Sequence, residues 1–281
     1  MSARWERIGS VVRRRRAENP GPMTLDGTNS YVLGVPGAGG VVVVDPGPLL
    51  DGHLQALAGA GAVELILISH HHGDHTDGSL ALHQRTGAPV RAAQPRYCHA
   101  ANPLYDGELI QAGGLTITVL ATPGHTSDSL CFAVTARDET EAPAMVLTGD
   151  TILGQGSTVI CYPDGRLGDY LDSLEKLRGW GLEHRTATQA VAGLPGHGPV
   201  LADVAEAAGA YAQHRAERLA QVRAAVEHLA GKGAPASTEA VTSIVYGDVP
   251  ANLQGAAQLS VEAQLDYLRS AGSAGQQPQG L

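Results

Sequence analysis

The chain has 281 residues, of which 43% are hydrophobic and 17% are charged, and its formal net charge is −9. This composition is typical of a globular protein and excludes an intrinsically disordered one. The acidic balance gives no long-range attraction for nucleic acid, although a local cationic site inside an acidic protein can still bind a phosphodiester.

Short apolar runs alternate with helical patterns from about residue 29 to 200, which predicts a layered α/β architecture, and we assign this domain to residues 1–201. The basic cluster from Arg13 to Arg16 is interpreted as an exposed edge strand or a solvated arm, with phosphate contact or targeting as the alternative. Strands are expected at residues 30–34, 41–45, 63–69, 89–92, 115–121, 130–135, 144–148 and 188–192, and helices at 52–60, 77–85 and 167–180.

The pattern changes after Pro199. Residues 202–229 have no strand signal and carry apolar side chains at helical spacing. Ser237 can cap a helix that runs to residue 246, and residues 260–269 predict another. We therefore expect a small helical C-terminal unit over residues 202–270 and a disordered tail over residues 271–281.

Cysteine usage and hydropathy bear on where the protein works. Cys98, Cys131 and Cys161 lie far apart without a CxxC pair, so neither a disulfide framework nor a thiolate metal site is expected. No apolar run is long enough for a membrane span, and the N-terminus lacks the apolar stretch of a secretory signal. These features favour a cytoplasmic protein that does not enter a membrane.

A histidine-rich motif, His70-His71-His72-Gly73-Asp74-His75, directly follows the apolar run VELILIS. Open α/β sheets place ligand sites at the carboxyl ends of strands, and imidazole and carboxylate are ligands of zinc and its neighbours. His70 and His72 are two residues apart and can converge on one ion. Asp74 and His75 are adjacent, so their side chains diverge and can serve a second. His71 alternates away from its neighbours and is left out of the ligand set.

Three further loops repeat this arrangement. The segments TPGHT, LTGD and LPGHG each follow a predicted strand, contain a glycine and place one metal-competent side chain after it. These side chains are His125, Asp150 and His197. A single such residue would more often be a turn or core residue, but four occurrences together predict a metal centre.

In this order, the HxHxDH motif at 70–75 with His125, Asp150 and His197 resembles the metal motifs of the metallo-β-lactamase superfamily. The resemblance implies an αββα sandwich, in which two facing sheets are flanked by helices and the metals lie at one edge. It implies one ion held by His70, His72 and His125, a second held by Asp74, His75 and His197, and Asp150 bridging the two.

The resemblance extends over roughly residues 19–270 to the lactamase-beta-2-like subgroup, through NPGPMTL, GTN, DTILGQGST, PGHGP and the pair Tyr246 and Val249-Pro250. Members of that subgroup include a single-strand-specific endoribonuclease, and close relatives include carrier-protein thioesterases. Its C-terminal part resembles a winged helix with a β-hairpin wing. Here the last predicted helix runs into GSAGQQPQGL, so we expect the wing to be reduced or absent.

A dinuclear site suggests the mechanism. Two Zn²⁺ ions are the expected cofactor, with Mn²⁺ or Fe compatible with the same ligands. Two ions about 3.5–4 Å apart can share a hydroxide near neutral pH. We expect this hydroxide to attack an ester, thioester or phosphodiester in the catalytic domain of residues 1–201. Asp74 would ligate and orient it and Asp150 would bridge the ions, so these two are the expected catalytic carboxylates.

The substrate stays open between two classes. Cleavage of single-stranded RNA is the first hypothesis, and hydrolysis of a thioester or another carboxylic ester is the alternative. The net charge, the scarcity of aromatic residues for base stacking and the missing wing count against RNA. A non-catalytic binding module is disfavoured because all seven ligands are present. The helical unit could cover the site, bind a partner or form a homodimer, and no substrate-binding residue is assigned.

Residues around the motif are harder to assign. Asp45, Asp77 and Thr126 are expected by location to support the ligands, and Asp45 fits a turn in Asp-Pro-Gly equally well. Asn29 and Tyr162 could approach substrate, although core or turn roles are favoured. The histidines outside the motifs are expected at the surface, namely His53, His83, His99, His184, His214 and His228.

Overall fold

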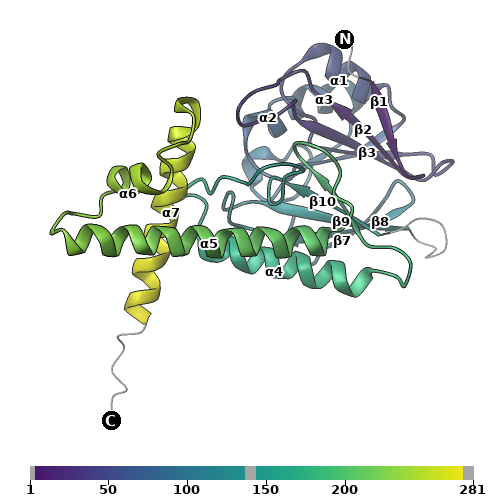
Figure 1. The fold of residues 1–281 in the computed structure, drawn as a ribbon. Helices are drawn as coiled ribbons and strands as arrows, with labels where there is room; N and C mark the ends of the chain where they lie inside the picture. The colour runs from purple at the N-terminus through teal and green to yellow at the C-terminus, as the bar shows by residue number, and fades with distance from the viewer. Residues whose placement is uncertain (1–3, 137–143, 275–281) are drawn as a thin grey trace.

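The computed structural model describes residues 4–136 and 144–274 and has four layers, in which two facing sheets are covered by helices on their outer faces (Figure 1). The first sheet has six strands in sequence order: β1 (Trp5–Ile8), β2 (Val12–Arg16), β3 (Asn29–Leu33), β4 (Val41–Val44), β5 (Val63–Leu67) and β6 (Val90–Arg91). The second has five, in the order β11 (Ala192–Pro195), β10 (Met145–Gly149), β9 (Leu130–Ala136), β8 (Leu115–Ala121) and β7 (Leu109–Ala112). The predicted αββα sandwich is confirmed.

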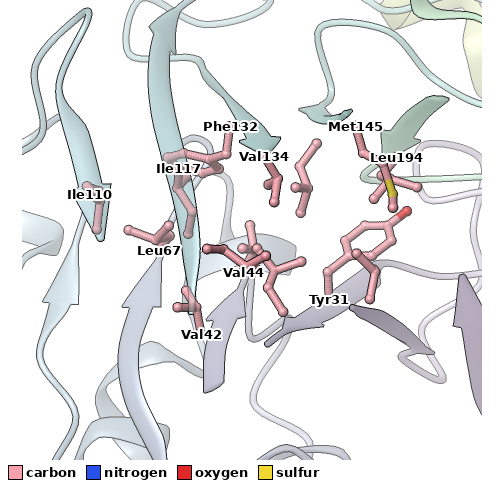
Figure 2. Packing of buried hydrophobic residues seen from close by; sticks show 14 of the residues in the cluster. Tyr31, Val42, Val44, Leu67, Ile110, Ile117, Phe132, Val134, Met145 and Leu194 are labelled. Carbon is pink, nitrogen blue, oxygen red and sulfur yellow. The ribbon is translucent and has the colours of Figure 1, made fainter. Parts of the chain in front are cut away.

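The main core lies between the two sheets (Figure 2). In β8 the residues alternate between buried and partly exposed, and Leu115, Ile117 and Val119 are buried. They meet side chains of the other sheet such as Val44 and Leu67. Period-two alternation is what a strand with one buried face requires. The pattern therefore fixes which face of β8 points inward.

Helices cover both outer faces. Two short helices, α1 (Asp51–Ala58) and α3 (Ser79–Thr86), pack on the first sheet through Leu54, Leu57 and Leu82. The second sheet is covered by α4 (Leu167–His184), whose buried Tyr170, Leu174 and Leu177 form one helical stripe. Of two 3₁₀ turns, η1 (Pro95–Tyr97) follows β6 and η2 (Ala251–Leu253) lies in the C-terminal region.

The C-terminal region is helical throughout its described part. It consists of α5 (Val204–Gly231), α6 (Thr238–Val245) and α7 (Gln254–Ala274), with η2 between the last two. Ser237 caps α6 by accepting a hydrogen bond from Ala240 N at 3.2 Å, as predicted. No β strand lies between residues 204 and 274, so the described region contains no wing. Residues 275–281 of the predicted tail lie outside the described part of the chain.

The helical region is attached at one end and forms its own core at the other. The first half of α5 packs along α4, where Val204 and Ala208 join the cluster under the second sheet. Its second half packs with α6 and α7 around Val222, Val241 and Val261. Figure 1 shows this second half extending beyond the sandwich. The boundary of a separate unit at residue 202 stays a prediction.

Two sequence interpretations need correction. A strand was expected at residues 188–192, but β11 spans Ala192–Pro195, because Ala192, Gly193 and Leu194 pair in parallel with β10. Pro195 is tolerated because it ends an edge strand. The Arg13–Arg16 cluster lies in β2, which pairs with β1 on one side and β3 on the other and is therefore not an edge.

The arginines of β2 have partners within the protein. Arg13 donates to the carbonyl of Ala60, and Arg14 forms an ion pair with Glu6. Arg16 pairs with Asp26 at 3.2 Å.

Among the described helices, none combines the length and the apolar character needed to cross a bilayer.

Candidate metal centre

All seven predicted ligands lie at one edge of the sandwich, in loops that follow strands. The loop after β5, in the first sheet, leads into α2 (Gly73–Thr76). The other three loops follow β8, β10 and β11 of the second sheet. The first loop carries His70 and His72, the α2 helix that follows it carries Asp74 and His75, and the other loops carry His125, Asp150 and His197. The two sheets thus contribute to one site.

Three imidazoles converge in the first half of the site. Nε2 of His70 lies 3.0 Å from Nδ1 of His72, and Nε2 of His125 lies 3.0 Å from the same Nδ1. The rings meet edge to face, with interplanar angles of 82° and 79° to His72. Three nitrogen atoms that face one point at this separation match the donor set of a zinc-type ion.

The second half of the site combines two imidazoles with a carboxylate. Nε2 of His75 lies 3.3 Å from Nε2 of His197. Oδ2 of Asp74 lies 3.2 Å from Nε2 of His197 and 3.4 Å from Nε2 of His75. These three residues form a second group able to hold an ion.

Asp150 stands between the two groups. Its Oδ2 lies 3.3 Å from Nε2 of His197, 3.8 Å from Nε2 of His125 and 4.0 Å from Nε2 of His70. Its Oδ1 is buried without a hydrogen-bond donor. A buried carboxylate oxygen without a donor is costly unless a cation satisfies it. The residues present therefore fit metal ions held by histidine and aspartate.

Asp45 orients two of the imidazoles. Its carboxylate accepts hydrogen bonds from Ser69 N at 2.7 Å, from Ser69 Oγ at 2.7 Å and from His75 Nδ1 at 2.9 Å. Ser69 Oγ also lies 3.0 Å from Nδ1 of His70. With Nδ1 of both rings engaged, Nε2 of each is left to face the site. Asp45 thus contacts His75 directly and His70 through Ser69, which are the contacts that its expected supporting role requires.

The remaining candidate ligands are held by backbone and hydroxyl groups. Nδ1 of His125 donates to the carbonyl of Val159 at 2.7 Å, and Nδ1 of His197 lies 3.3 Å from the carbonyl of Gly27. Thr28 Oγ1 donates to Asp74 Oδ2 at 2.9 Å. Each contact fixes one ligand before any ion binds, which reduces the reorganisation that binding requires.

The histidines of the site divide into two electrostatic kinds, and the first kind is uncharged. Burial and the neighbouring imidazoles hold the pKa of His70 well below its ordinary value, and burial with His125 lowers the pKa of His72 to about 4. Burial also lowers the pKa of His125. These three rings are therefore neutral near pH 7 and present lone pairs, as a metal ligand must.

The carboxylates reverse this tendency in the second group. Burial alone would lower the pKa of His75 and His197, but Asp150 and Asp74 outweigh it and raise them to about 9 and about 10. Burial would raise the pKa of Asp150, but His197 and His75 hold it at about 2. The pKa of Asp74 is lowered too, because His75 and His197 outweigh its burial. The site thus favours positive charge, which suits a cation.

Two glycines allow the loops to approach this closely. A Cβ on Gly196 would collide with Oδ1 of Asp150 and lie 2.7 Å from Cε1 of His75. Gly124 has a φ of +142°, and a Cβ there would collide with the backbone of Tyr170 on α4. The glycine that precedes histidine in both PGH segments is therefore required by packing.

Other residues singled out in the sequence have structural partners. His71 lies outside the converging groups, and its Nδ1 is 2.7 Å from Oδ1 of Asp128. Thr126 Oγ1 donates to the same oxygen of Asp128 at 2.9 Å. Asn29 is buried and donates to the carbonyls of Pro195 and Gly198, which is a turn-holding role.

A cavity of about 690 Å³ opens beside the metal centre, between the sandwich and the C-terminal helices. Its lining includes His125 and Asp150 from the site, together with Met23, Leu153 and Leu253. This volume lies within the range of small-molecule sites. The cavity joins segments that are far apart in sequence.

Sequence reasoning missed the residues that line this cavity from α5. His214, expected at the surface, lines it together with Arg215 and Arg218. Arg218 follows Arg215 by three residues and His214 by four, which makes it a neighbour of both along the helix, and this spacing is the signal that could have found them. His53, also expected at the surface, is only 6% exposed because it faces the first sheet from α1 and contacts Ser30 Oγ at 2.8 Å.

The chain is similar to known proteins along most of its length. The family model of the metallo-beta-lactamase superfamily matches residues 23–179. The chain is 32% identical over 276 residues to the beta-lactamase-like protein 2 homolog of Caenorhabditis elegans, covering 94% of this chain and 85% of that protein. It is also 32% identical over 257 residues to the atrochrysone carboxyl ACP thioesterase of Aspergillus chevalieri, covering 87% and 76%.

Solved structures agree on the architecture. A metallo-beta-lactamase family protein from Thermus thermophilus superposes with a TM-score of 0.71 at 24% identity, covering 93% of this chain and 94% of that one. A beta-lactamase domain protein from Burkholderia ambifaria gives a TM-score of 0.74 at 20% identity, covering 96% and 89%. At this level of identity the two similarities show the fold.

Proposed function

Because the chain belongs to the metallo-beta-lactamase superfamily and is a hydrolase of that family, we propose that it cleaves acyl thioesters at a dinuclear metal centre. The observation that carries this proposal is a cavity of about 690 Å³ that opens directly onto His125 and Asp150. The similarity to a thioesterase of an acyl carrier protein supports the same substrate class.

We assign the ligands in two groups. His70, His72 and His125 would hold one ion, and Asp74, His75 and His197 would hold the other, with Asp150 shared between them. The donor set suits zinc and is also compatible with Mn²⁺ or Fe. When bound, such ions supply Lewis acidity and lower the pKa of water enough for a nucleophile to exist near pH 7.

The protein's own groups prepare the site for this chemistry. Asp74 is 26% exposed at its side chain, whereas the carboxylate of Asp150 is 10% exposed, so Asp74 is the more accessible of the two. Thr28 fixes the Asp74 carboxylate by donating to Oδ2 at 2.9 Å. Both carboxylates are ionised near neutral pH. Asp74 can therefore accept a hydrogen bond from an approaching water molecule and orient it.

The shape of the cavity favours a thioester over single-stranded RNA. Much of its wall is apolar, and it is closed on one side by α5 and α7. Proteins that bind single-stranded nucleic acid without sequence preference present stacked aromatic side chains along a basic groove. Tyr211 and Tyr246 are the only tyrosine, phenylalanine or tryptophan residues among those that line the cavity in the described chain. RNA cleavage is the competing outcome of the test.

The test compares the two substrate classes on the zinc-loaded protein. Thiol release from a panel of neutral and carboxylated acyl thioesters of N-acetylcysteamine is followed beside cleavage of a fluorogenic single-stranded RNA. We expect thiol release that is lost in Asp74→Asn and kept in Asp172→Asn, a carboxylate on α4 away from the ligand loops that serves as the matched control. RNA cleavage without thiol release, or no turnover of either class, would overturn the thioester assignment.

A further inference from the structure

The cavity beside the metal centre is basic on the side formed by α5. Arg215 and Arg218 line it one helical turn apart, and His214 lies next to them. Among the described residues that line the cavity, Asp150 is the only acidic one, and it belongs to the metal centre. This positive lining stands in a protein whose formal net charge is −9.

Arg215 is a buried cation without a carboxylate partner. It is 5% exposed, and within the described chain it forms no ion pair with an acidic side chain at 4.0 Å or less. Its guanidinium donates to the carbonyl of Thr158 and lies 5.1 Å from the ring centroid of Tyr170. Its Nε has no hydrogen-bond partner. Buried charges are normally paired with an opposite charge. A buried arginine that lines a cavity and has no carboxylate partner therefore indicates that an anionic ligand binds there.

The segment that contains Thr158 and Val159 connects Arg215 to the metal centre. Thr158, whose carbonyl accepts from Arg215, donates through Oγ1 to the carbonyl of Asp150 at 2.8 Å. The next residue, Val159, holds His125 through its carbonyl. Arg218 lies 5.0 Å from the ring centroid of Tyr246 and extends the basic surface toward α6. An anion bound here would occupy the same cavity as the group that is cleaved.

We propose that Arg215 and Arg218 bind an anionic group of the substrate, so that the preferred thioesters carry a carboxylate or a phosphate besides the thioester. This inference rests on the proposed thioester hydrolysis and specifies its substrate class. The apolar walls around Met23, Leu153 and Leu253 would hold the hydrocarbon part of the same molecule. Guanidinium groups pair with both anions in bidentate geometry, which gives orientation as well as affinity.

Kinetics on matched substrates test the arginines. Pentanoyl and glutaryl thioesters of N-acetylcysteamine have acyl chains of equal length and differ by one carboxylate, and pentanoyl phosphopantetheine places a phosphate on the thiol side. We expect Arg215→Gln and Arg218→Gln to lower the ratio of kcat/KM for an anionic substrate to kcat/KM for the neutral thioester about ten- to one-hundred-fold, whatever the change in absolute turnover. Arg215→Lys should recover part of the loss. Arg223→Gln, on the exposed face of the same helix, is the matched control.

A binding measurement separates this inference from the proposed function. Calorimetry on the zinc-loaded protein compares pentanoate, glutarate and phosphopantetheine, and we expect the extra anion to tighten binding in the wild type but not in the arginine variants. If the wild type and both arginine variants preferred the ligands with the extra anion over pentanoate to the same extent, the anion site would be overturned. Arginine-dependent binding without any thioester turnover would support the anion site and overturn thioester hydrolysis. Arginine-dependent cleavage of RNA alone would overturn both.

Discussion

Replacing Asp45 with asparagine tests how the protein orients its metal ligands. Asp45 is 3% exposed and has a φ of +51°, a left-handed conformation that asparagine tolerates about as well as aspartate. The substitution therefore leaves the backbone free of new strain. It changes only the group that meets Ser69 and His75.

The size of the effect follows from the three donors around the carboxylate. Oδ1 accepts from Ser69 N, and Oδ2 accepts from Ser69 Oγ and His75 Nδ1. In either orientation, an asparagine amide NH₂ would face at least one of these donors. A hydrogen bond to a charged group contributes about 1.5–3 kcal/mol. We therefore expect metal affinity to fall about ten- to one-hundred-fold, as is typical when the partner of a ligating histidine is lost.

Competition with a chromophoric chelator measures this affinity, and the metal content of the dialysed protein gives the stoichiometry. Asp128→Asn is the matched control, because Asp128 is also buried and contacts His71, which lies outside the ligand groups. Wild-type metal affinity in Asp45→Asn, or an equal loss in both variants, would refute the idea that Asp45 acts by orienting His75.

Three further changes probe the site and its surroundings. Asp150→Asn should abolish bound metal and turnover together, since it weakens the shared carboxylate; metal analysis showing full occupancy with normal turnover would contradict this. Gly196→Ala should reduce metal content while far-UV circular dichroism stays native-like, because the added Cβ meets Asp150 and His75. Burial and Arg15 lower the pKa of His53 to about 4 in the folded protein. As the pH falls, His53 therefore takes up a proton in the unfolded chain before it does so in the folded protein, and the free energy of unfolding decreases between pH 6.5 and 4. Urea unfolding at pH 7 and pH 5 should show a loss of about 2 kcal/mol that shrinks in His53→Gln, and an unchanged pH dependence would refute the assignment.

The ligand loops could be predicted from the sequence because each signal is local. An apolar strand followed by glycine and a metal-competent side chain places that side chain at the carboxyl end of a sheet, whichever strands pair with it. His70 and His197 were found in this way although they lie far apart along the chain. Asp45 shows the limit of this reasoning. Its turn role and its supporting role were alternatives in the sequence, whereas in the structure one residue combines a φ of +51° with three accepted hydrogen bonds, one of them from His75.

Features that depend on how helices dock were not accessible in the same way. Arg215 faces the cavity only because α5 packs along α4 and reaches the loop of Thr158. His53 could have been identified, since it lies four residues before the fully buried Leu57 and so on the same face of α1. The strand at β11 was placed too early because Pro195 and Gly196 read as a loop, whereas parallel pairing with β10 continues to Pro195.

The origin of the ligands in both sheets has a consequence for the chain as a polymer. His75 follows a strand of the first sheet and His197 follows a strand of the second, and 122 positions separate them. A cation held by both would act as a reversible cross-link that closes a very long loop. Such closure constrains the chain in the manner of a disulfide, but its strength would follow the free concentration of metal in the surroundings.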